Sequence, residues 1–353
     1  MDVASSHIAI DICEWAHMAK ARRRAAELAT KLGFTEQAVG EVSIVMVELT
    51  ENLVAHGAVR GRILLSVVEQ GDRKGLQIIS EDSGPGIADV SWAIQDGHSK
   101  KTTLGIGLGA VKRLMDEFDI ISQTERKGTT AKADNKQGIG TVVGARKWLP
   151  AQGAETTKPA ATMSFGIMSR PVQGETANGD GYFLKYDKDA VLVATIDGLG
   201  HGPDAEAATR EATATLADES SKPLDVILAS MHKRLRKTRG VAVSLARIRP
   251  VDGTMDYAGV GNVVTRVYNS PQPVRPVNFN GIVGANLRQI RVYQYPWHAQ
   301  NVLIMTSDGI SEKYDPDSYP GLLGKHPMII SSVLLRDFGR ENDDATVAVG
   351  AKP

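Results

Sequence analysis

The sequence predicts a two-domain protein of the α/β (α+β) class, in which an α/β sandwich is followed by packed β-sheets flanked by helices. Its 353 residues exceed the size at which a single hydrophobic core keeps growing. The first half mixes helical and strand patterns, whereas the second half is mostly strand-like. Between them, residues 151–160 are small, polar or proline and lack apolar periodicity, which predicts a linker. The expected domains are residues 1–150 and 161–353.

Composition narrows the class of protein further. Hydrophobic residues make up 42% and charged residues 23%, as in ordinary folded proteins. Lysine plus arginine and aspartate plus glutamate both total 41, so no net charge favours nucleic acid or an anionic membrane, and the expected partners are proteins and small ligands. The single cysteine, Cys13, excludes disulfides within the chain, and no signal peptide or membrane span is predicted. We therefore expect a cytoplasmic protein.

The first half is expected to contain helices followed by strands. Apolar residues at helical spacing over 14–32, closed by Gly33, predict one helix, and Thr35 is the expected N-cap of a second that ends at Gly57. The remaining predicted elements are strands over 62–70 and 75–82 joined by a turn at Gly71–Lys74, a helix over 110–118, and strands over 118–125 and 140–148. In the second half, long helical patterns occur only near 203–218 and 224–238.

A polar stripe on the second predicted helix suggests ATP chemistry. Glu48 and Asn52 are four residues apart and therefore share one face of the helix. A glutamate there can polarise an attacking hydroxyl, while an asparagine offers Mg²⁺ a neutral oxygen ligand that also contacts phosphate. Taken alone, this pair is more typical of a solvated helix face.

Two glycine clusters strengthen the nucleotide hypothesis. Asp82 ends an apolar strand, where its carboxylate can accept a hydrogen bond from an amino group such as that of adenine, and Gly84 and Gly86 let the backbone approach the ring. Gly105, Gly107 and Gly109 lead directly into a predicted helix, whose free N–H groups and dipole favour phosphate. An ordinary turn is the alternative for the first cluster. A dinucleotide-binding motif is rejected for the second, because a polar segment rather than a strand precedes it.

Glu-x-x-x-Asn, Asp-x-Gly-x-Gly and Gly-x-Gly-x-Gly in this order resemble the GHKL ATPases, which have a Bergerat-type α/β sandwich. The segments VELTENLVAHG, EDSGPGIADVSWAIQDG and LGIGLGAVKRLMDEF resemble, within that family, the stressosome switch kinases of the RsbT type and their anti-sigma-factor relatives. The resemblance implies that Asn52 binds Mg²⁺ and phosphate, that Asp82 recognises adenine, that the glycines shape the pocket, and that Glu48 is the catalytic base. Either 128–130 or 140–141 matches the family's terminal Gly-Thr. The resemblance further implies phosphorylation of Ser or Thr on STAS-domain antagonists, which are stressosome components.

Acidic residues recur at strand ends in the second half. They are Asp180, Asp197, Asp308, Asp343 and Asp344. Carboxylates that end separate strands can converge on hard divalent cations, and Gly198 after Asp197 can add its carbonyl oxygen. Two such cations would activate a water for in-line attack on a phosphoryl group. Any single Asp-Gly is more often a turn, so the prediction depends on their joint occurrence.

Two further residues attract attention but stay outside the predicted ligand set. His201 follows Asp197 in a glycine-rich loop, where a metal or acid role competes with the more frequent structural one. Arg170 precedes the first acidic residue and could hold a substrate phosphate, although a surface arginine is at least as typical.

The acidic motifs in this order resemble the PPM family of Mg²⁺/Mn²⁺-dependent Ser/Thr phosphatases, specifically its SpoIIE and RsbX branch. The resemblance implies a PPM-type β-sandwich in which Asp197 bridges two metals, Gly198 offers its carbonyl, Asp308 and either Asp343 or Asp344 bind one metal, and Asp180 lies beside the other. Together the motifs predict a bifunctional regulator that uses ATP to phosphorylate STAS-domain proteins and removes phosphate from Ser or Thr. The alternative is a phosphatase gated by a non-catalytic ATP-binding domain that docks partners.

Overall fold

The computed structural model describes residues 7–55, 58–95, 107–124, 140–150 and 163–352. The chain divides into two compact units, an N-terminal unit of residues 7–154 with 315–325 and a C-terminal unit that contains 155–314 and 326–353. Residues 315–325 thus group with the N-terminal unit although they lie in the C-terminal part of the sequence. The predicted linker lies outside the described residues, and the predicted domain limits stay a prediction.

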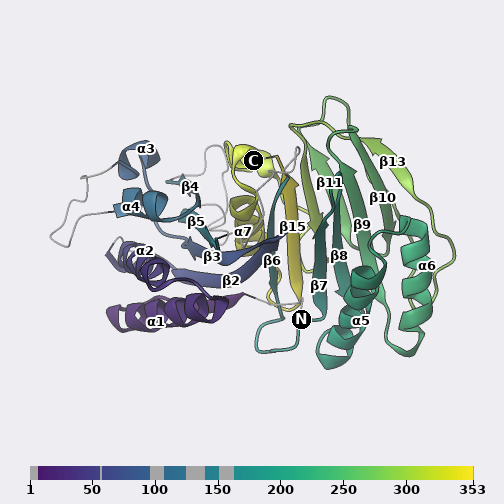
Figure 1. The fold of residues 1–353 in the computed structure, drawn as a ribbon, viewed down its shortest axis with the longest axis horizontal. Coiled ribbons are helices and arrows are strands. Elements are labelled where there is room, and N and C mark those ends of the chain that lie inside the picture. Colours follow the sequence, from purple (N-terminus) through teal and green to yellow (C-terminus); the bar gives the residue numbers. More distant parts are fainter. Residues whose placement is uncertain (1–6, 56–57, 96–106, 125–139, 151–162, 353) are drawn as a thin grey trace. The chain divides into compact units, whose positions relative to one another are not determined.

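The N-terminal unit is an α/β sandwich in which helices cover one face of an antiparallel sheet (Figure 1). The sheet has five strands in the order β1-β2-β3-β5-β4. Its strands are β1 (Ile8–Asp11), β2 (Arg62–Gln70), β3 (Arg73–Glu81), β4 (Glu117–Gln123) and β5 (Gly140–Trp148). The helices are α1 (Trp15–Leu32), α2 (Glu36–Ala55), α3 (Val90–Ala93) and α4 (Gly107–Leu114). The predicted α/β sandwich is confirmed.

Local sequence signals explain where the two long helices begin and end. Gly33 closes α1 with φ 93°, a left-handed conformation that glycine adopts without steric cost. The Thr35 hydroxyl accepts a hydrogen bond from the Ala38 N–H at 3.3 Å, as expected of an N-cap. Small buried residues on α1, Ala25 among them, let it pack closely against α2. The first predicted helix pair is therefore confirmed, with Gly57 outside the described residues.

Two predictions for this unit were wrong in detail. Arg73 and Lys74 belong to β3, because the strands pair as far as Gln70 and Arg73 and leave only Gly71 and Asp72 to turn. The helix predicted over 110–118 is α4, which begins earlier and ends at Leu114. Residues from Glu117 onward join β4 instead, since pairing with β5 supplies the hydrogen bonds that a longer helix would have made.

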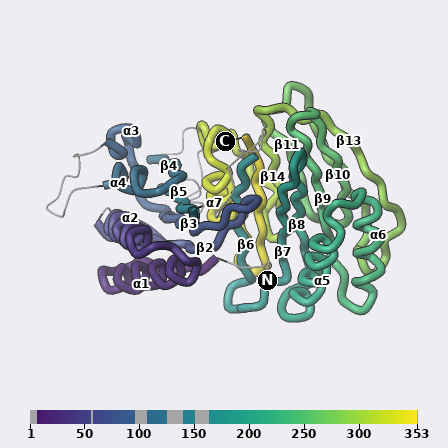
Figure 2. The backbone as a smooth tube through the Cα atoms, viewed as in Figure 1, coloured from purple at the N-terminus to yellow at the C-terminus, as the bar shows by residue number. Residues whose placement is uncertain are grey.

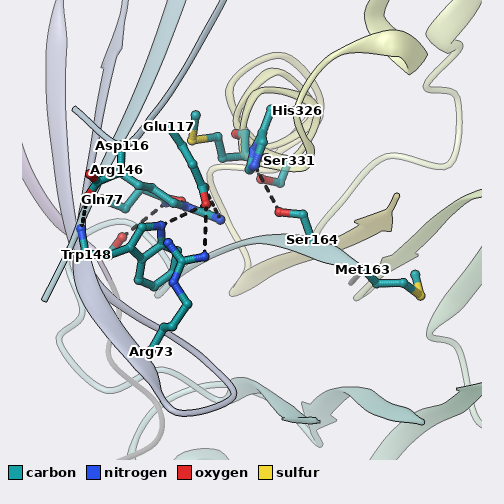
Figure 3. Close-up of polar contacts among 12 residues, drawn as sticks. Arg73, Gln77, Asp116, Glu117, Arg146, Trp148, Met163, Ser164, His326 and Ser331 are labelled. Atoms are coloured by element: carbon teal, nitrogen blue, oxygen red, sulfur yellow. Dashed lines mark hydrogen bonds and ion pairs between the residues drawn. The ribbon is translucent and has the colours of Figure 1, made fainter. Parts of the chain in front are cut away.

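The sheet face away from the helical core carries a buried charged network (Figure 3). The Arg146 guanidinium on β5 donates to the Gln77 side-chain oxygen from Nε at 2.8 Å and from Nη2 at 2.7 Å. It also contacts Glu117 at 3.3 Å, and the Glu117 carboxylate accepts from the Trp148 indole at 2.9 Å. These contacts tie β3, β4 and β5 together through side chains, because a buried guanidinium must have its donors satisfied.

The C-terminal unit is a sandwich of two sheets. The larger sheet has six strands, ordered β12-β10-β9-β8-β7 with β13 beside β10, and the smaller has four, ordered β11-β14-β15-β6. The larger sheet contains β7 (Asp180–Tyr186), β8 (Val191–Gly198), β9 (Val241–Arg249), β10 (Thr254–Val260), β12 (Asn278–Phe279) and β13 (Tyr293–Pro296). The smaller contains β6 (Ser164–Arg170), β11 (Val264–Tyr268), β14 (Val302–Thr306) and β15 (Ala345–Ala351). Apolar side chains from both sheets, including Phe165, Val193 and Met305, form the core between them.

Helices cover the outer faces of this sandwich (Figure 2). The larger sheet is covered by α5 (Pro203–Glu219) and α6 (Leu224–Arg234), and the smaller by α7 (Pro327–Phe338). Short 3-10 turns occur at Leu235–Lys237, Pro316–Ser318 and Leu322–Gly324. The predicted β-sandwich flanked by helices is confirmed. No helix in the described part of the chain is long and apolar enough to cross a membrane.

The sequence predicted α5 and α6 but missed α7. Nearly every side chain of α7 is buried, so MIISSVLL lacks the polar face that marks an amphipathic helix. A short apolar run of this kind cannot be distinguished from a buried strand by periodicity. His326 caps the helix by accepting from the Met328 N–H at 3.2 Å, and its other ring nitrogen lies 3.0 Å from the Ser164 hydroxyl on β6 (Figure 3).

Gly166→Ala should destabilise the C-terminal unit. Gly166 lies on β6 against the start of α7, and a Cβ there would collide with the backbone of Pro327. We expect the free energy of unfolding to fall by about 1–3 kcal/mol, as for overpacking in general, in chemical denaturation. The control is Gly40→Ala at an exposed position of α2, where a Cβ has no neighbour within 4 Å. For this variant we expect the free energy of unfolding to rise by about 0.5–1 kcal/mol. An unchanged midpoint for Gly166→Ala would contradict the tight packing of α7 on β6.

Candidate nucleotide and metal sites

The predicted catalytic residue of the first half, Glu48, is held against the start of α4. Its carboxylate accepts a hydrogen bond from the Gly107 N–H, and both residues are half-buried. Burial raises the pKa of the Glu48 carboxyl, the neighbouring Glu51 raises it further, and the Gly107 N–H opposes both. Asn52 lies one turn further along α2, on the same side. The glycine-rich start of α4 and the polar stripe of α2 are therefore neighbours.

The Asp82 segment forms a tight loop after β3. The Gly84 N–H donates to Asp82 Oδ1 at 2.7 Å, which folds the chain back on the carboxylate. Gly86 has φ 75°, and a Cβ there would collide with the Gln123 carbonyl at the end of β4. The glycines at 84 and 86 thus let this loop lie directly against the sheet edge.

One alternative at the end of the domain can be placed next to Asp82. The Asp82 N–H donates to the Thr141 carbonyl at 3.0 Å, and Gly140 has no room for a Cβ beside the Asp82 carbonyl. The Thr141 hydroxyl lies 2.8 Å from the Ser122 hydroxyl. The rival Gly-Thr at 128–130 and Gly105 of the second glycine cluster lie outside the described residues. Gly107 and Gly109 form the first turn of α4.

In the C-terminal unit, two predicted metal ligands are paired across neighbouring strands. Asp180 begins β7, Asp197 comes near the end of β8, and the antiparallel register sets them directly opposite each other. Asp180 is buried, and its Oδ2 accepts from the Ser307 hydroxyl at 2.5 Å. Burial raises the pKa of both carboxyls, and neighbouring negative charges raise each pKa further.

Asp308 and Asp343 approach this pair from the smaller sheet. Asp308 follows β14, and its charge raises the pKa of Asp197 after the larger effects of burial and of Asp180. Its Oδ2 accepts from the Asn262 amide at 2.5 Å. Asp343 precedes β15, and burial first and Asp308 second raise the pKa of its carboxyl. Because β14 and β15 are hydrogen-bonded neighbours, these carboxylates share one edge of the sandwich with Asp180 and Asp197.

Asp344 makes different contacts from the adjacent Asp343. It is buried, its Oδ1 accepts from the Val172 N–H at 2.8 Å, and its Oδ2 accepts from the Gly179 N–H at 2.9 Å. Both carboxylate oxygens therefore hold backbone in front of β7. Arg170 also holds backbone, because its guanidinium donates to the carbonyls of Arg340 at 2.6 Å and Pro171 at 3.2 Å. These bonds fix the segment that carries Asp343.

One of the carboxylate oxygens at this edge lacks a hydrogen-bond partner within the described residues, as expected of a ligand for a divalent cation. Oδ2 of Asp197 is buried and has no hydrogen-bond partner among the described residues. An unpaired buried carboxylate oxygen is costly, and a hard cation is the partner that a cluster of oxygen donors accepts best. Within the described residues, no three His, Cys, Asp or Glu side chains converge as a ready-made cage. Asp308 nevertheless lies close enough to Asp180, Asp197 and Asp343 for its charge to raise the pKa of each carboxyl.

Sequence reasoning missed Ser307 and Asn262. Ser307 precedes Asp308 in TSDG, so a hydroxyl beside a predicted ligand was the available signal. Asn262 follows β10 and meets Asp308 from 46 positions away, and nothing in its local sequence indicates that contact.

Comparison with known proteins assigns both units to families. A family described as histidine kinase-like ATPase domain matches residues 13–133, and the SpoIIE family, described as stage II sporulation protein E, matches residues 187–348. Serine/threonine-protein kinase RsbT of Bacillus subtilis (strain 168) is 38% identical over 136 residues, or 38% of this chain and 91% of that protein. Phosphoserine phosphatase RsbX of the same organism is 23% identical over 180 residues, or 50% of this chain and 89% of that protein.

The chain is a fusion of an RsbT-like ATPase domain with a SpoIIE/RsbX-like domain. Part of the chain is also similar to a solved structure described as "The bacterial stressosome: a modular system that has been adapted to control secondary messenger signaling", at 28% identity and a TM-score of 0.51 over 54% of this chain and 99% of that one. The two family matches confirm the predicted Bergerat-type and PPM-type folds. The SpoIIE match contains Asp197, Asp308 and Asp343 but begins after Asp180, and the match to the ATPase family contains Glu48 and the glycine clusters.

Ser307→Ala should destabilise the SpoIIE-like domain. The substitution removes the donor to buried Asp180 and the acceptor of the Thr346 N–H, which lies 2.9 Å from the Ser307 hydroxyl. A loss of about 1–3 kcal/mol in the free energy of unfolding is expected by denaturant titration, because buried polar groups are left unpaired. Ser221→Ala, an exposed site, is the matched control. Equal stability of the two variants would show that the Ser307 contacts contribute nothing.

Proposed function

We propose that this fusion protein transfers phosphate from ATP to Ser or Thr of STAS-domain switch proteins, and removes phosphate from phospho-Ser or phospho-Thr proteins by a two-metal mechanism. The observation that carries the phosphatase half is the unpaired buried Oδ2 of Asp197 among neighbouring carboxylates. The kinase half is supported by Glu48, whose ionisable carboxyl lies at the glycine-rich start of α4. Similarity to a Ser/Thr kinase and to a phosphoserine phosphatase supports both enzymatic activities.

The carboxylate edge would hold the divalent cations, Mg²⁺ or Mn²⁺. Asp197 would bridge them, the Gly198 carbonyl would join one, and Asp308 and Asp343 would bind the other. We assign Asp343 rather than Asp344 because both oxygens of Asp344 already accept backbone N–H groups. When bound, the cations supply charge neutralisation and an activated water for in-line attack on phosphorus.

The chain's own residues perform the positioning in this site. Ser307 orients Asp180 by donating to its Oδ2, and Asn262 orients Asp308 in the same way. The β7–β8 register holds Asp180 opposite Asp197, so Asp180 would lie next to the bridging ligand. Burial of this pair excludes bulk water from one side of the site, which strengthens the attraction between the carboxylates and a cation.

In the RsbT-like domain, Glu48 would accept the proton of the attacking Ser or Thr hydroxyl. Asn52 would bind Mg²⁺ and phosphate, and Asp82 would recognise the adenine amino group. Gly84, Gly86, Gly105, Gly107 and Gly109 would shape the pocket. Thr141 is the better candidate for the terminal Gly-Thr contact, because it is hydrogen-bonded to the Asp82 backbone. A cytoplasmic location and STAS-domain partners complete the proposal, and similarity to RsbT and to a solved stressosome structure supports the partners.

Asp197→Asn should abolish phosphatase activity and metal binding together. The change removes the charge of the proposed bridging ligand, so release of phosphate from a phosphoserine peptide with Mn²⁺ should fall by at least about 100-fold. The rise in melting temperature that Mn²⁺ gives the unmodified protein should also vanish. Asp252→Asn, an exposed aspartate in the β9–β10 turn, should change neither result. Phosphate release that survives Asp197→Asn would refute the assigned site.

Glu48→Gln should stop phosphoryl transfer without stopping ATP binding. Loss of a general base lowers transfer from labelled ATP to a STAS protein by about 10²–10⁴-fold, whereas binding measured by calorimetry should persist. Because the pKa of Glu48 is raised above its ordinary 4.5, the unmodified kinase should lose activity as the pH falls through that raised value and the base becomes protonated. Glu36→Gln, exposed in the first turn of α2, is the control.

Transfer that persists in Glu48→Gln would contradict a catalytic base. If ATP then changed the rate of phosphatase turnover, the RsbT-like domain would be a nucleotide-dependent regulator of the attached phosphatase, which is the alternative function.

A further inference from the structure

The outer face of the larger sheet has a cavity beside the start of α6. Helix α6 packs against β10 on this face (Figure 1), and the cavity next to it has a volume of about 430 Å³. Arg247, Arg249 and Asp256 line it from the sheet, Leu224 from the first turn of α6, and Val292 from the segment before β13. Charged and apolar side chains therefore meet in one hollow.

The arginines of this cavity continue a row of core residues along β9. Val241, Val243 and Leu245 belong to the apolar core that lies between the sheet and its covering helices. Arg247 and Arg249 follow in the same row, because alternate residues of a strand share one face. The carboxylate edge pairs with the start of β9, so the cavity lies at the other end of that strand. It is thus separate from the proposed phosphatase site.

Arg247 is buried but uses only part of its hydrogen-bonding capacity. The residue is 8% exposed, and its Nη2 donates to the carbonyls of Ser220 at 2.5 Å and Lys222 at 2.7 Å. These bonds hold the connection between α5 and α6 against the sheet. Nε and Nη1 have no hydrogen-bond partner among the described residues. Because every guanidinium N–H is a donor, these atoms are available to a molecule in the cavity.

Arg247 also lacks a carboxylate that is bonded to it. Asp256 is its partner in the β9–β10 register, but the Asp256 carboxylate accepts from Arg249 Nη1 at 2.7 Å and from the Gln294 amide at 3.0 Å. Burial lowers the pKa of Arg247, the charge of Arg249 lowers it further, and Asp256 and Asp187 oppose this decrease only in part. An anion that entered the cavity would therefore stabilise a buried cation that now lacks a direct partner.

The rest of the lining limits which anion fits. Leu224, Ile290 and Val292 are apolar, so an apolar body can be buried beside the charged group. Asp225 and Asp256 also line the cavity, and their charges repel a ligand that carries several negative charges. No side chain caps the start of α6, where the positive end of the helix dipole favours a negative charge. This lining suits a single carboxylate on an apolar body better than a polyanion.

We propose that this cavity binds a small molecule that has one carboxylate group and an apolar body. The carboxylate accepts hydrogen bonds from the unused donors of Arg247, and Arg249 adds a second positive charge. Hydrogen bonds between ionised partners are roughly twice as strong as those between neutral ones. The apolar body lies against Leu224, Ile290 and Val292. The site requires neither ATP nor metal, so its occupancy can be measured without turnover.

Binding of benzoate to the full chain, without metal or ATP, tests the site by ligand-detected NMR titration. Benzoate combines a carboxylate with an apolar ring, whereas benzamide keeps the ring without the charge and acetate keeps the charge without the ring. We expect saturable binding of benzoate and affinities at least about tenfold lower for the other two, because each loses one of the two interactions. Equal affinities for benzoate and benzamide, or no saturable binding of benzoate, would overturn the proposal.

Variants of Val292 test whether benzoate binds in this cavity. Val292 is 40% exposed, so its replacement leaves the core intact. Val292→Asp sets a negative charge beside the ligand and should lower benzoate affinity by at least about tenfold, whereas Val292→Asn, of nearly the same size, should retain most of it. Val277→Asp, at an exposed valine before β12, which pairs with the other end of β10, should have no effect. Equal affinities in Val292→Asp and Val292→Asn would contradict the assigned cavity.

Arg247→Met tests the arginine itself. The change should lower benzoate affinity at least as much as Val292→Asp does, because it removes the donors and the charge together. It also removes the bonds to the Ser220 and Lys222 carbonyls, so its melting temperature should fall and binding is measured below that temperature. A folded Arg247→Met protein that bound benzoate with full affinity would refute the role of Arg247.

Discussion

Mutual repulsion among carboxylates at one edge of the C-terminal sandwich governs how that domain is built. The antiparallel β7–β8 register leaves Asp180 and Asp197 no freedom to separate, and the β14–β15 pair brings Asp308 and Asp343 to the same edge. Burial removes the water that would otherwise screen these charges, so the pKa values of Asp180, Asp197 and Asp343 rise together. Such a cluster is unfavourable by itself and becomes favourable with divalent cations, which is why the edge suits metal-dependent phosphate chemistry.

Glycines allow the edge to close, and polar side chains keep it ordered. A Cβ on Gly198 would lie 2.6 Å from the Ala205 carbonyl and 2.7 Å from the Gly179 carbonyl, so the end of β8 can rest on α5 only as glycine. Buried Ser307 then fixes Asp180, and exposed Asn262 fixes Asp308. Asp344 resembles a ligand in sequence but contributes to this support, since it orders the backbone through two N–H groups. Under the proposed function, ligands and supporting residues differ in their hydrogen bonds rather than in residue type.

The sequence predicted those features that local patterns encode. Gly33, which ends α1, has a local conformational cause, and so does the Thr35 cap. The acidic residues were recognised because each lies beside an apolar strand. Contacts between segments distant in sequence could not be predicted from local patterns. Ser307, for example, contacts Asp180, which lies 127 positions away. The choice between Asp343 and Asp344 was also open in the sequence, because two adjacent aspartates differ only in the contacts that they make in the folded chain. Helix α7 was missed because burial on all sides erased its periodicity.

The fusion imposes a constraint that separate enzymes do not have. A kinase and a phosphatase on one chain are made in equal amounts, so the phosphorylated fraction of a shared substrate cannot be set by their relative abundance. Under the proposed function it depends on the state of each site. The raised pKa of Glu48 makes transfer sensitive to proton concentration, and the Asp197 cluster makes hydrolysis sensitive to divalent cations. The balance between the two activities would then respond to pH and metal supply even at constant protein concentration.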